Sequence, residues 1–207
     1  QFRGLCHYIN DDNFTNEVIN GDVHQRNADI LGISRPQAKT FIYAYLFGAG
    51  HAKLGEAVSG KKSAKIGKDA DAKFKATLPG LKVLKDQLED EYRMSQLKTG
   101  QGFIMGADGR RVMVGSEHQT LNYLLQTLEG ITCKAALVYA SKKIKELGLS
   151  AYPTLFYHDE VVFVAKESDA EKVKEICVEA FKEAPKSVGV MCMDGDGQIG
   201  DSYADVH

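Results

Sequence analysis

Two β-rich runs late in the chain lie between long helix-forming segments, and this order limits the folds that the sequence can adopt. The runs are Thr154 to Tyr157 and Val161 to Ala165. A helix is predicted before them, from Ser116 to about Leu147, and another after them, from Ser168 to Ala184. The short connection between the runs predicts an antiparallel hairpin. Helices and hairpins in this order indicate an α+β fold, with antiparallel strands and helices on one face.

Helix-forming segments separated by glycine and proline fill the first hundred residues. Gly21 separates two short helices, and Gly32 ends the second. Ser34 and Gln37 then form a predicted capping box, which opens a helix that runs to about Phe47. The other predicted elements are helices over Lys61 to Thr77 and Leu81 to Gln96, a hairpin over Gly102 to Val114 with its turn at Asp108-Gly109, a capping box at Ser116 to Gln119, and a short strand near Val188 to Met193.

The length and the cysteines narrow the class of protein. A chain of 207 residues buries one substantial core, or a core plus a mobile subdomain. Its four cysteines stand apart, without a CxxC pair, and predict reduced thiols rather than a disulfide framework or a zinc site. We expect no secretory signal, and the longest apolar segment is shorter than the roughly 20 residues that span a bilayer. A soluble cytoplasmic protein is therefore expected.

The net charge of -2 hides an uneven distribution. Residues 51–100 contain 11 basic and 7 acidic residues, whereas residues 158–207 contain 5 lysines and 12 acidic residues. A basic middle could attract a polyanion, and an acidic end could gather metal cations. Solvated helix faces explain many of these charges equally well.

The first candidate site is a stripe of Arg35, Lys39, Tyr43 and Phe47. Steps of four residues keep these side chains on one face of a helix. Two cations followed by two aromatic rings suit a nucleoside triphosphate, because cations contact phosphate oxygens and the rings contact sugar and base. The alternative is an amphipathic helix with a basic end and an aromatic face directed to the core.

The second candidate is the triplet His158, Asp159 and Glu160 between the two β-rich runs. The apolar flanks predict buried strands that place the carboxylates at the end of the sheet. One or two carboxylates suit magnesium, which keeps positions for substrate phosphates. The alternative is an ordinary surface hairpin.

Two weaker patterns remain. His118, Asn122 and Gln126 are spaced by four on one predicted helix and could hydrogen-bond to sugars and to the minor-groove acceptors that all base pairs share. The run 194–197, Asp-Gly-Asp-Gly, has the start of a calcium loop without the later ligands, and it is interpreted as a turn.

Taken in order, these segments resemble family A DNA polymerases of the short-tailed-phage replicative type. RPQAKTFIYAYLFGAG resembles the fingers motif, YHDEVVF the third palm motif, and GADGRRVMV with HQTLNYLLQ the hairpin and the template-primer helix. GDVH and RGLCHYIN resemble the segments before the fingers helix and after the first palm motif. The resemblance covers the whole chain and implies part of a right-hand polymerase: connecting helices in residues 1–30, fingers in 31–100, and palm with a C-terminal tail in 101–207.

The resemblance implies a role for each candidate residue. In the family, a primer 3′-hydroxyl attacks the α-phosphate of a deoxynucleoside triphosphate, aided by two magnesium ions. The catalytic residues would be Lys39, His158, Asp159 and Glu160, with Asp159 and Glu160 as the metal ligands and His158 beside the primer end. The other implied contacts are Arg35, Lys39 and His24 with the triphosphate, Tyr43 with the nascent base pair near the sugar, Gln1 with the sugar, and His118, Asn122 and Gln126 with primer-template DNA.

The sequence also departs from the family pattern. The aspartate of the first palm motif would precede Gln1, and Gln1 itself stands where relatives usually have a glutamate that excludes the ribose 2′-hydroxyl. The isolated chain is therefore expected to be inactive unless an upstream polymerase fragment supplies the missing aspartate. The expected partners are primer-template DNA and deoxynucleoside triphosphates, with no membrane, in the cytoplasm of a bacterial host if the chain is phage-encoded. The alternatives are a non-catalytic nucleic-acid-binding protein derived from a polymerase, and a metal-dependent nuclease that uses Asp159 and Glu160.

Overall fold

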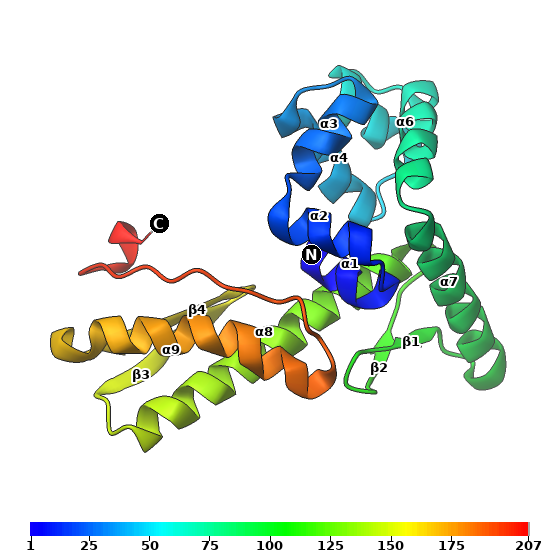
Figure 1. The fold of residues 1–207 in the computed structure, drawn as a ribbon. Coiled ribbons are helices and arrows are strands. Elements are labelled where there is room, and N and C mark those ends of the chain that lie inside the picture. The colour runs from blue at the N-terminus through cyan, green and yellow to red at the C-terminus, as the bar shows by residue number, and fades with distance from the viewer. Residues whose placement is uncertain (207) are drawn as a thin grey trace. The chain divides into compact units, whose positions relative to one another are not determined.

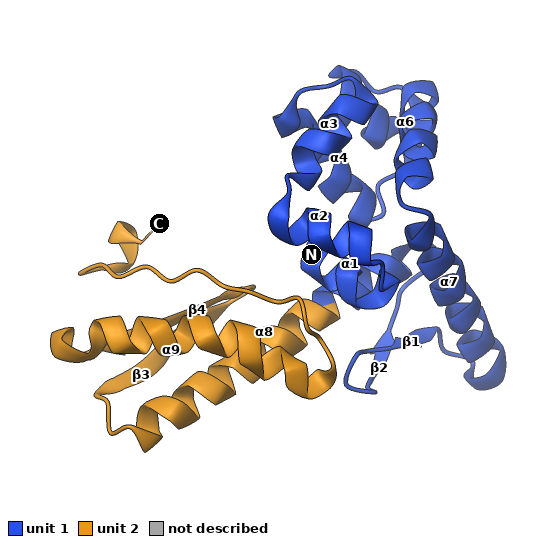
Figure 2. Ribbon diagram, in the orientation of Figure 1, with its two compact units in different colours: residues 1–126 blue, residues 127–207 orange. Residues whose placement is uncertain are grey.

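A computed structural model describes residues 1–206, and the chain forms two compact units, shown in Figures 1 and 2. Unit 1 is Gln1–Gln126, and unit 2 begins at Thr127. The described residues are mostly helical, with one two-stranded antiparallel sheet in each unit. This confirms the predicted α+β class.

The helices of unit 1 begin and end at signals that the sequence shows. Asp11 caps the second helix by accepting a hydrogen bond from the Phe14 backbone amide at 2.8 Å. Ser34 and Gln37 form the predicted capping box. Gly32 ends the preceding helix with a left-handed φ of 69°. The helices of this unit are α1 (Phe2–Ile9), α2 (Asp12–Asn20), α3 (Val23–Leu31), α4 (Arg35–Leu46), α5 (His51–Ser59), α6 (Ala64–Thr77) and α7 (Pro79–Thr99).

Helix α5 was not predicted, and its packing against α6 explains why. The two helices approach so closely that their backbones touch at Gly55 and Gly67. A β-carbon on Gly67 would lie 1.8 Å from the His51 carbonyl oxygen, and one on Gly55 would lie 2.0 Å from the Ser63 carbonyl oxygen. Glycine has low helix propensity, so the residues that this contact requires weaken the sequence pattern of the helix.

We expect Gly67→Ala to destabilise the protein by about 3 kcal/mol or more, because the added methyl group overlaps backbone that cannot rotate away. The control is Gly130→Ala in α8 (Thr120–Glu146), where an added β-carbon meets nothing within 4 Å. That change should be neutral or stabilising by about 0.5–1 kcal/mol. Thermal unfolding followed by circular dichroism measures both, and equal midpoints for Gly67→Ala and the unchanged protein would contradict the backbone contact.

One face of α4 forms the centre of the unit 1 core. Phe41 is fully buried, and its ring packs edge-on against Phe74 of α6 at 5.8 Å between centroids. The Tyr45 ring lies 4.9 Å from the same phenylalanine. Because this face is buried, the opposite face of α4 is free to present its polar side chains.

A small hairpin packs on α7. Its strands are β1 (Phe103–Met105) and β2 (Arg111–Met113), joined by the predicted turn in which Gly109 adopts a φ of 78°. Ile104 is fully buried. The Ser95 hydroxyl of α7 donates to the Phe103 carbonyl oxygen at 2.9 Å and accepts from the Phe103 amide at 2.8 Å.

Unit 2 contains the second hairpin and its supporting helices. Strands β3 (Ala151–Tyr157) and β4 (Glu160–Ala165) pair antiparallel, with Tyr157 opposite Glu160. Helix α9 (Ala170–Glu183) packs against α8 through small and branched side chains. Phe163 and Ala165 of β4 join this core. The buried residues of the core are Ala136, Ala140, Ile144, Val173, Ile176, Ala180 and Ala184.

Several expectations for this half of the chain were wrong. Strand β3 is exposed from Tyr152 to Tyr157, because the hairpin residues that pack on the unit 2 core, Ala151, Phe163 and Ala165, lie at the end of the hairpin away from its tip. No strand occurs near residues 188–193 within the described residues. Pro185 lies in a 3₁₀ turn there, and Gly189 follows with a φ of 79°, so the backbone turns instead of extending.

Two further local expectations need correction. The Ser116 hydroxyl donates to the Gln119 side-chain oxygen at 2.9 Å, but it accepts no backbone hydrogen bond, so no capping box forms. A 3₁₀ turn, η1 (Glu117–Gln119), precedes α8. The run 194–197 is irregular backbone rather than a turn. All four cysteines are free, and no helix in the described part of the chain is long and apolar enough to cross a membrane.

Candidate functional site

The predicted stripe of α4 lies on the face of the helix opposite the core. Arg35 and Lys39 are exposed, Tyr43 is half-buried, and Phe47 caps the helix with 44% of its surface exposed. The Tyr43 and Phe47 rings stack with their centroids 6.2 Å apart and their planes 24° apart. The four residues therefore form one continuous surface, cationic at the start of the helix and aromatic at its end.

His24 of α3 joins this surface, although it lies eleven or more residues before the stripe in sequence. Its ring centroid is 6.3 Å from that of Tyr43. Burial lowers the pKa of His24, and the charges of Arg35 and Lys39 lower it further, against the opposing effect of Asp22. The imidazole therefore lies in a cationic environment. Its buried Nδ1 has no hydrogen-bond partner among the described residues.

Asp22 also borders the candidate site, although it was not predicted from the sequence. Its carboxylate accepts hydrogen bonds from the His24 and Gln25 backbone amides and so caps α3. It also accepts a hydrogen bond from Arg35 Nε at 2.8 Å. The hydrogen bond from Arg35 is the main reason that the pKa of Asp22 is lowered. Asp22 thus links the start of α3 to the first cation of α4. The sequence offered one signal for this residue, which is an aspartate directly before the start of a helix.

Gln1 reaches the same region through the start of α1. It occupies the N-cap position, and its buried side-chain oxygen has no hydrogen-bond partner within residues 1–206. The next residue, Phe2, packs edge-on against His24 with centroids 5.6 Å apart. Unit 1 therefore brings together His24, Arg35, Lys39 and Tyr43, and Phe2 connects Gln1 in sequence to this group.

The predicted DNA-contacting residues lie where α8 begins. His118 is exposed in η1, whereas Asn122 and Gln126 lie on α8, so the three do not share one regular helix as expected. The buried Asn122 Oδ1 has no partner in the described part of the chain. The end of α4 lies beside η1, because a β-carbon on Gly48 would lie 3.1 Å from the His118 carbonyl oxygen.

In unit 2, His158 and Asp159 form the two-residue tip of the β3–β4 hairpin. His158 has a φ of 52°, a left-handed conformation that costs a residue with a β-carbon about 1–2 kcal/mol. The Tyr157 and His158 rings pack edge-on with centroids 4.4 Å apart. Two-residue hairpin turns require a positive φ at their first central residue, so this conformation fits an ordinary turn as well as a functional one.

The tip presents two adjacent carboxylates. Asp159 is exposed, and its charge contributes to raising the pKa of Cys133 on α8 to about 11, after the larger effects of burial and of Glu129. No group of three or more potential metal ligands occurs among the described residues. The oxygen donors of Asp159 and Glu160 suit a hard divalent cation, but two carboxylates supply only part of a coordination shell.

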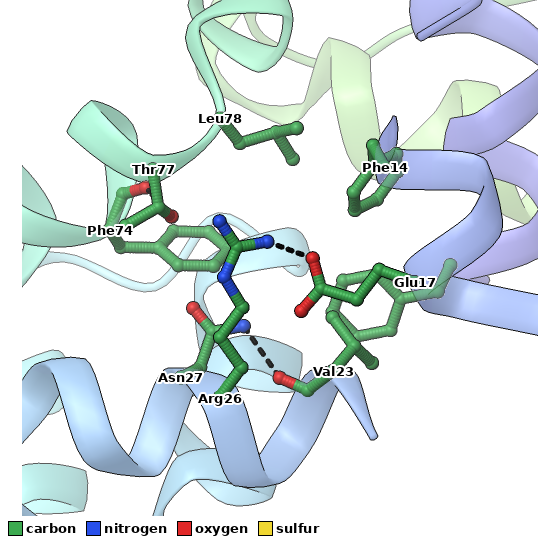
Figure 3. A pocket seen from close by; sticks show the side chains of 9 residues that line it. Phe14, Glu17, Val23, Arg26, Asn27, Phe74, Thr77 and Leu78 are labelled. Carbon is green, nitrogen blue, oxygen red and sulfur yellow. Dashed lines mark hydrogen bonds and ion pairs between the residues drawn. The ribbon is translucent and has the colours of Figure 1, made fainter. Parts of the chain in front are cut away.

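Unit 1 also contains the pocket shown in Figure 3. Arg26 of α3 forms an ion pair with Glu17 of α2 across it, and the Asn27 amide donates to the Val23 carbonyl oxygen at 2.7 Å. Phe74, Thr77 and Leu78 close the other side. Most residues that line the pocket belong to α2, α3 and α6, and none of the predicted site residues lines it.

The chain is similar to known proteins over nearly its whole length. A family model described as DNA polymerase family A matches residues 1–205. The chain is 30% identical to the DNA-directed DNA polymerase of Escherichia phage T7 over 231 residues, covering all of this chain and 32% of that protein. The DNA-directed DNA polymerase of Escherichia phage Phieco32 is 32% identical and is covered to 33%. The chain thus spans about a third of the length of these curated relatives.

A solved structure shares the fold. It is the POL domain of Pol1 from M. smegmatis in complex with DNA primer-template and dNTP. The TM-score is 0.77 at 17% sequence identity, and the match covers 96% of this chain and 37% of that one. At this identity, the likeness is evidence for the fold alone.

Proposed function

Because the chain belongs to DNA polymerase family A, we propose that it forms the fingers and part of the palm of a DNA-directed DNA polymerase. In this proposal, residues 1–30 connect the two regions, residues 31–100 are the fingers, and residues 101–207 belong to the palm with its tail. The enzyme would add deoxynucleotides to a primer 3′ end under the direction of a template.

The observation that carries this proposal is the surface shared by α3 and α4. Arg35 and Lys39 supply cations for triphosphate oxygens, and His24 lies beside them with a buried nitrogen that has no partner within the described residues. Tyr43 supplies a ring for the sugar and base. Such cations counter the charge that develops on the leaving pyrophosphate. Gln1, at the start of α1, would contact the sugar.

Polymerases of this family generally use divalent metal ions. We propose that Asp159 and Glu160 hold magnesium, which would activate the primer hydroxyl and neutralise phosphate charge when bound. His158 would lie beside the primer end. No group of three or more potential metal ligands occurs among the described residues, so in this proposal a further carboxylate would come from an upstream polymerase segment.

Primer-template DNA would bind at the start of α8. His118 and Gln126 are exposed and Asn122 is half-buried. Their side chains can donate to the minor-groove acceptors that every base pair presents, which gives contact without sequence preference. Binding of this kind suits an enzyme that must copy any template.

The proposal is tested by a gel-shift assay and a complementation assay. The chain should bind a primer-template, and the matched deoxynucleoside triphosphate should tighten the complex. The addition of the upstream segment of a family relative should then restore primer extension. Binding without any effect of nucleotide, and without extension after complementation, would instead indicate a non-catalytic nucleic-acid-binding protein.

The pKa of His24 provides a direct test of the triphosphate site. In the free chain, His24 should titrate below its ordinary value, because burial and two nearby cations disfavour the imidazolium. A bound triphosphate adds negative charge and should raise this pKa. Nuclear magnetic resonance titration of the histidine ring, with and without a deoxynucleoside triphosphate, measures the change. An unchanged His24 titration under saturating nucleotide would contradict the assignment.

A further inference from the structure

Arg93 of α7 contacts three carboxylates, two on its own helix and one much later in the chain. Its Nη1 donates a hydrogen bond to Asp90 Oδ1 at 2.8 Å, and its Nη2 lies 3.6 Å from Glu89 Oε2. The same Nη2 also donates to Glu117 Oε1, 24 residues later in the sequence. Glu117 is the first residue of η1, and η1 packs against α7. The guanidinium therefore ties the turn that precedes α8 to α7.

The contact between Arg93 and Glu117 is a charge-assisted hydrogen bond. It is the largest cause of the lowered pKa of Glu117, and it also raises the pKa of Arg93. The two side chains are 50% and 39% exposed. Exposed ion pairs contribute little to the stability of a fold. The effect of this pair is therefore expected to be local, on the orientation of η1.

The rest of η1 is held by other contacts. Ser116 precedes η1 without making a side-chain capping hydrogen bond, and its hydroxyl donates instead to the Gln119 side-chain oxygen at 2.9 Å. The same hydroxyl lies 3.4 Å from His118 Nε2. A β-carbon on Gly48 would lie 3.1 Å from the His118 carbonyl oxygen. The turn thus contacts both α7 and the residues that follow α4, while His118 remains exposed.

The geometry of a 3₁₀ turn connects the direction of Glu117 to that of His118. Successive residues are about 120° apart around the axis, because such a turn has three residues per turn. When Glu117 is anchored on α7, the His118 side chain therefore points in a different and defined direction. The hydrogen bonds of a 3₁₀ turn have poor geometry, so the anchor decides how firmly this direction is kept.

We propose that Arg93 is a positioning residue for primer-template binding, which holds Glu117 and thereby directs the His118 ring toward the DNA. This inference rests on the proposed contact between His118 and primer-template DNA. Arg93 touches neither substrate nor metal in this role. The competing interpretation, in which Arg93 itself binds a DNA phosphate, predicts the opposite effect of changing Glu117, because removal of that carboxylate would free the guanidinium.

Glu117→Gln separates these two roles, because it removes the anchor and also makes the chain more positive. A more positive chain binds DNA more tightly through general electrostatics. If Arg93 positions His118, Glu117→Gln should nevertheless weaken binding of a fluorescently labelled primer-template about two- to fivefold, in line with the loss of an exposed ion pair. Arg93→Met should weaken it to the same extent. Glu56→Gln, the matched control, makes the same charge change at an exposed position of α5 and should not weaken binding.

His118→Ala shows whether the effect passes through the histidine. This variant should weaken primer-template binding about two- to tenfold, as expected for the loss of one hydrogen bond. In the His118→Ala background, Glu117→Gln should cause no further weakening, because residues that act through one contact are not additive. Fluorescence anisotropy at several salt concentrations provides a second readout. Arg93→Met should keep the salt dependence of the unchanged chain, whereas loss of a direct phosphate contact would reduce its slope by about one.

Unchanged or tighter binding by Glu117→Gln, or a reduced salt slope in Arg93→Met, would overturn the positioning role. Additive effects of Glu117→Gln and His118→Ala would overturn it as well. If His118→Ala binds the primer-template normally, the proposed DNA contact of His118 fails. Hydrogen exchange of the free chain tests the anchor separately: Arg93→Met should accelerate exchange of the Gln119 amide, which bonds to the Ser116 carbonyl oxygen, about two- to fivefold. Equal exchange would show that Arg93 does not hold η1.

Discussion

Asp159→Asn is expected to reduce primer extension in the complemented enzyme by on the order of a thousandfold or more. The reason is that catalytic residues that act as a unit lose most of the rate when any one of them is removed. Asparagine keeps the shape of the side chain but loses the charge that would hold a divalent metal. Asp159 is exposed at the hairpin tip, so the free energy of unfolding should change by no more than about 0.5 kcal/mol. Single-nucleotide extension under saturating DNA measures the loss.

The control for this variant is Asp196→Asn, which removes an exposed carboxylate from the same unit by the same chemical change. In the complemented enzyme, it should extend primers at the rate of the natural sequence. If Asp159→Asn retained activity within a few-fold of this control, Asp159 would not be a metal ligand. The two variants together separate a catalytic carboxylate from the general acidity of the C-terminal region.

Features set by local sequence were predictable. The start of α4 follows from hydrogen bonds between Ser34 and Gln37, three residues apart. The four-residue spacing from Arg35 to Tyr43 then places these side chains on one face, whatever the rest of the fold does. For the same reason, the turn at Gly109 could be identified from two adjacent residues.

Features set by tertiary contacts were not predictable in the same way. Helix α5 depends on the backbone contact at Gly55 and Gly67. Glycine usually indicates that a segment is not helical, whereas here it allows two helices to pack closely. Strand β3 has the apolar composition of a buried strand, yet it is exposed, since burial depends on what covers the sheet.

The candidate sites show the same division. The resemblance named His24, but its place beside Tyr43 depends on how α3 packs on α4. Asp22 was missed because its role combines helix capping with a hydrogen bond from Arg35, 13 residues later.

Lys39→Ala should weaken the nucleotide-dependent tightening of the primer-template complex by on the order of 10- to 100-fold, since a hydrogen bond to a charged group contributes about 1.5–3 kcal/mol. Lys39 is exposed on the free face of α4, so the fold should persist. Binding of primer-template without nucleotide should stay the same, because that step does not involve the triphosphate. Lys68→Ala on the exposed side of α6 is the matched control, and it should leave both complexes unchanged. If the two variants depend equally on the nucleotide, the charge of Lys39 contributes no more than that of any other exposed lysine. In that case, α4 does not bind the triphosphate.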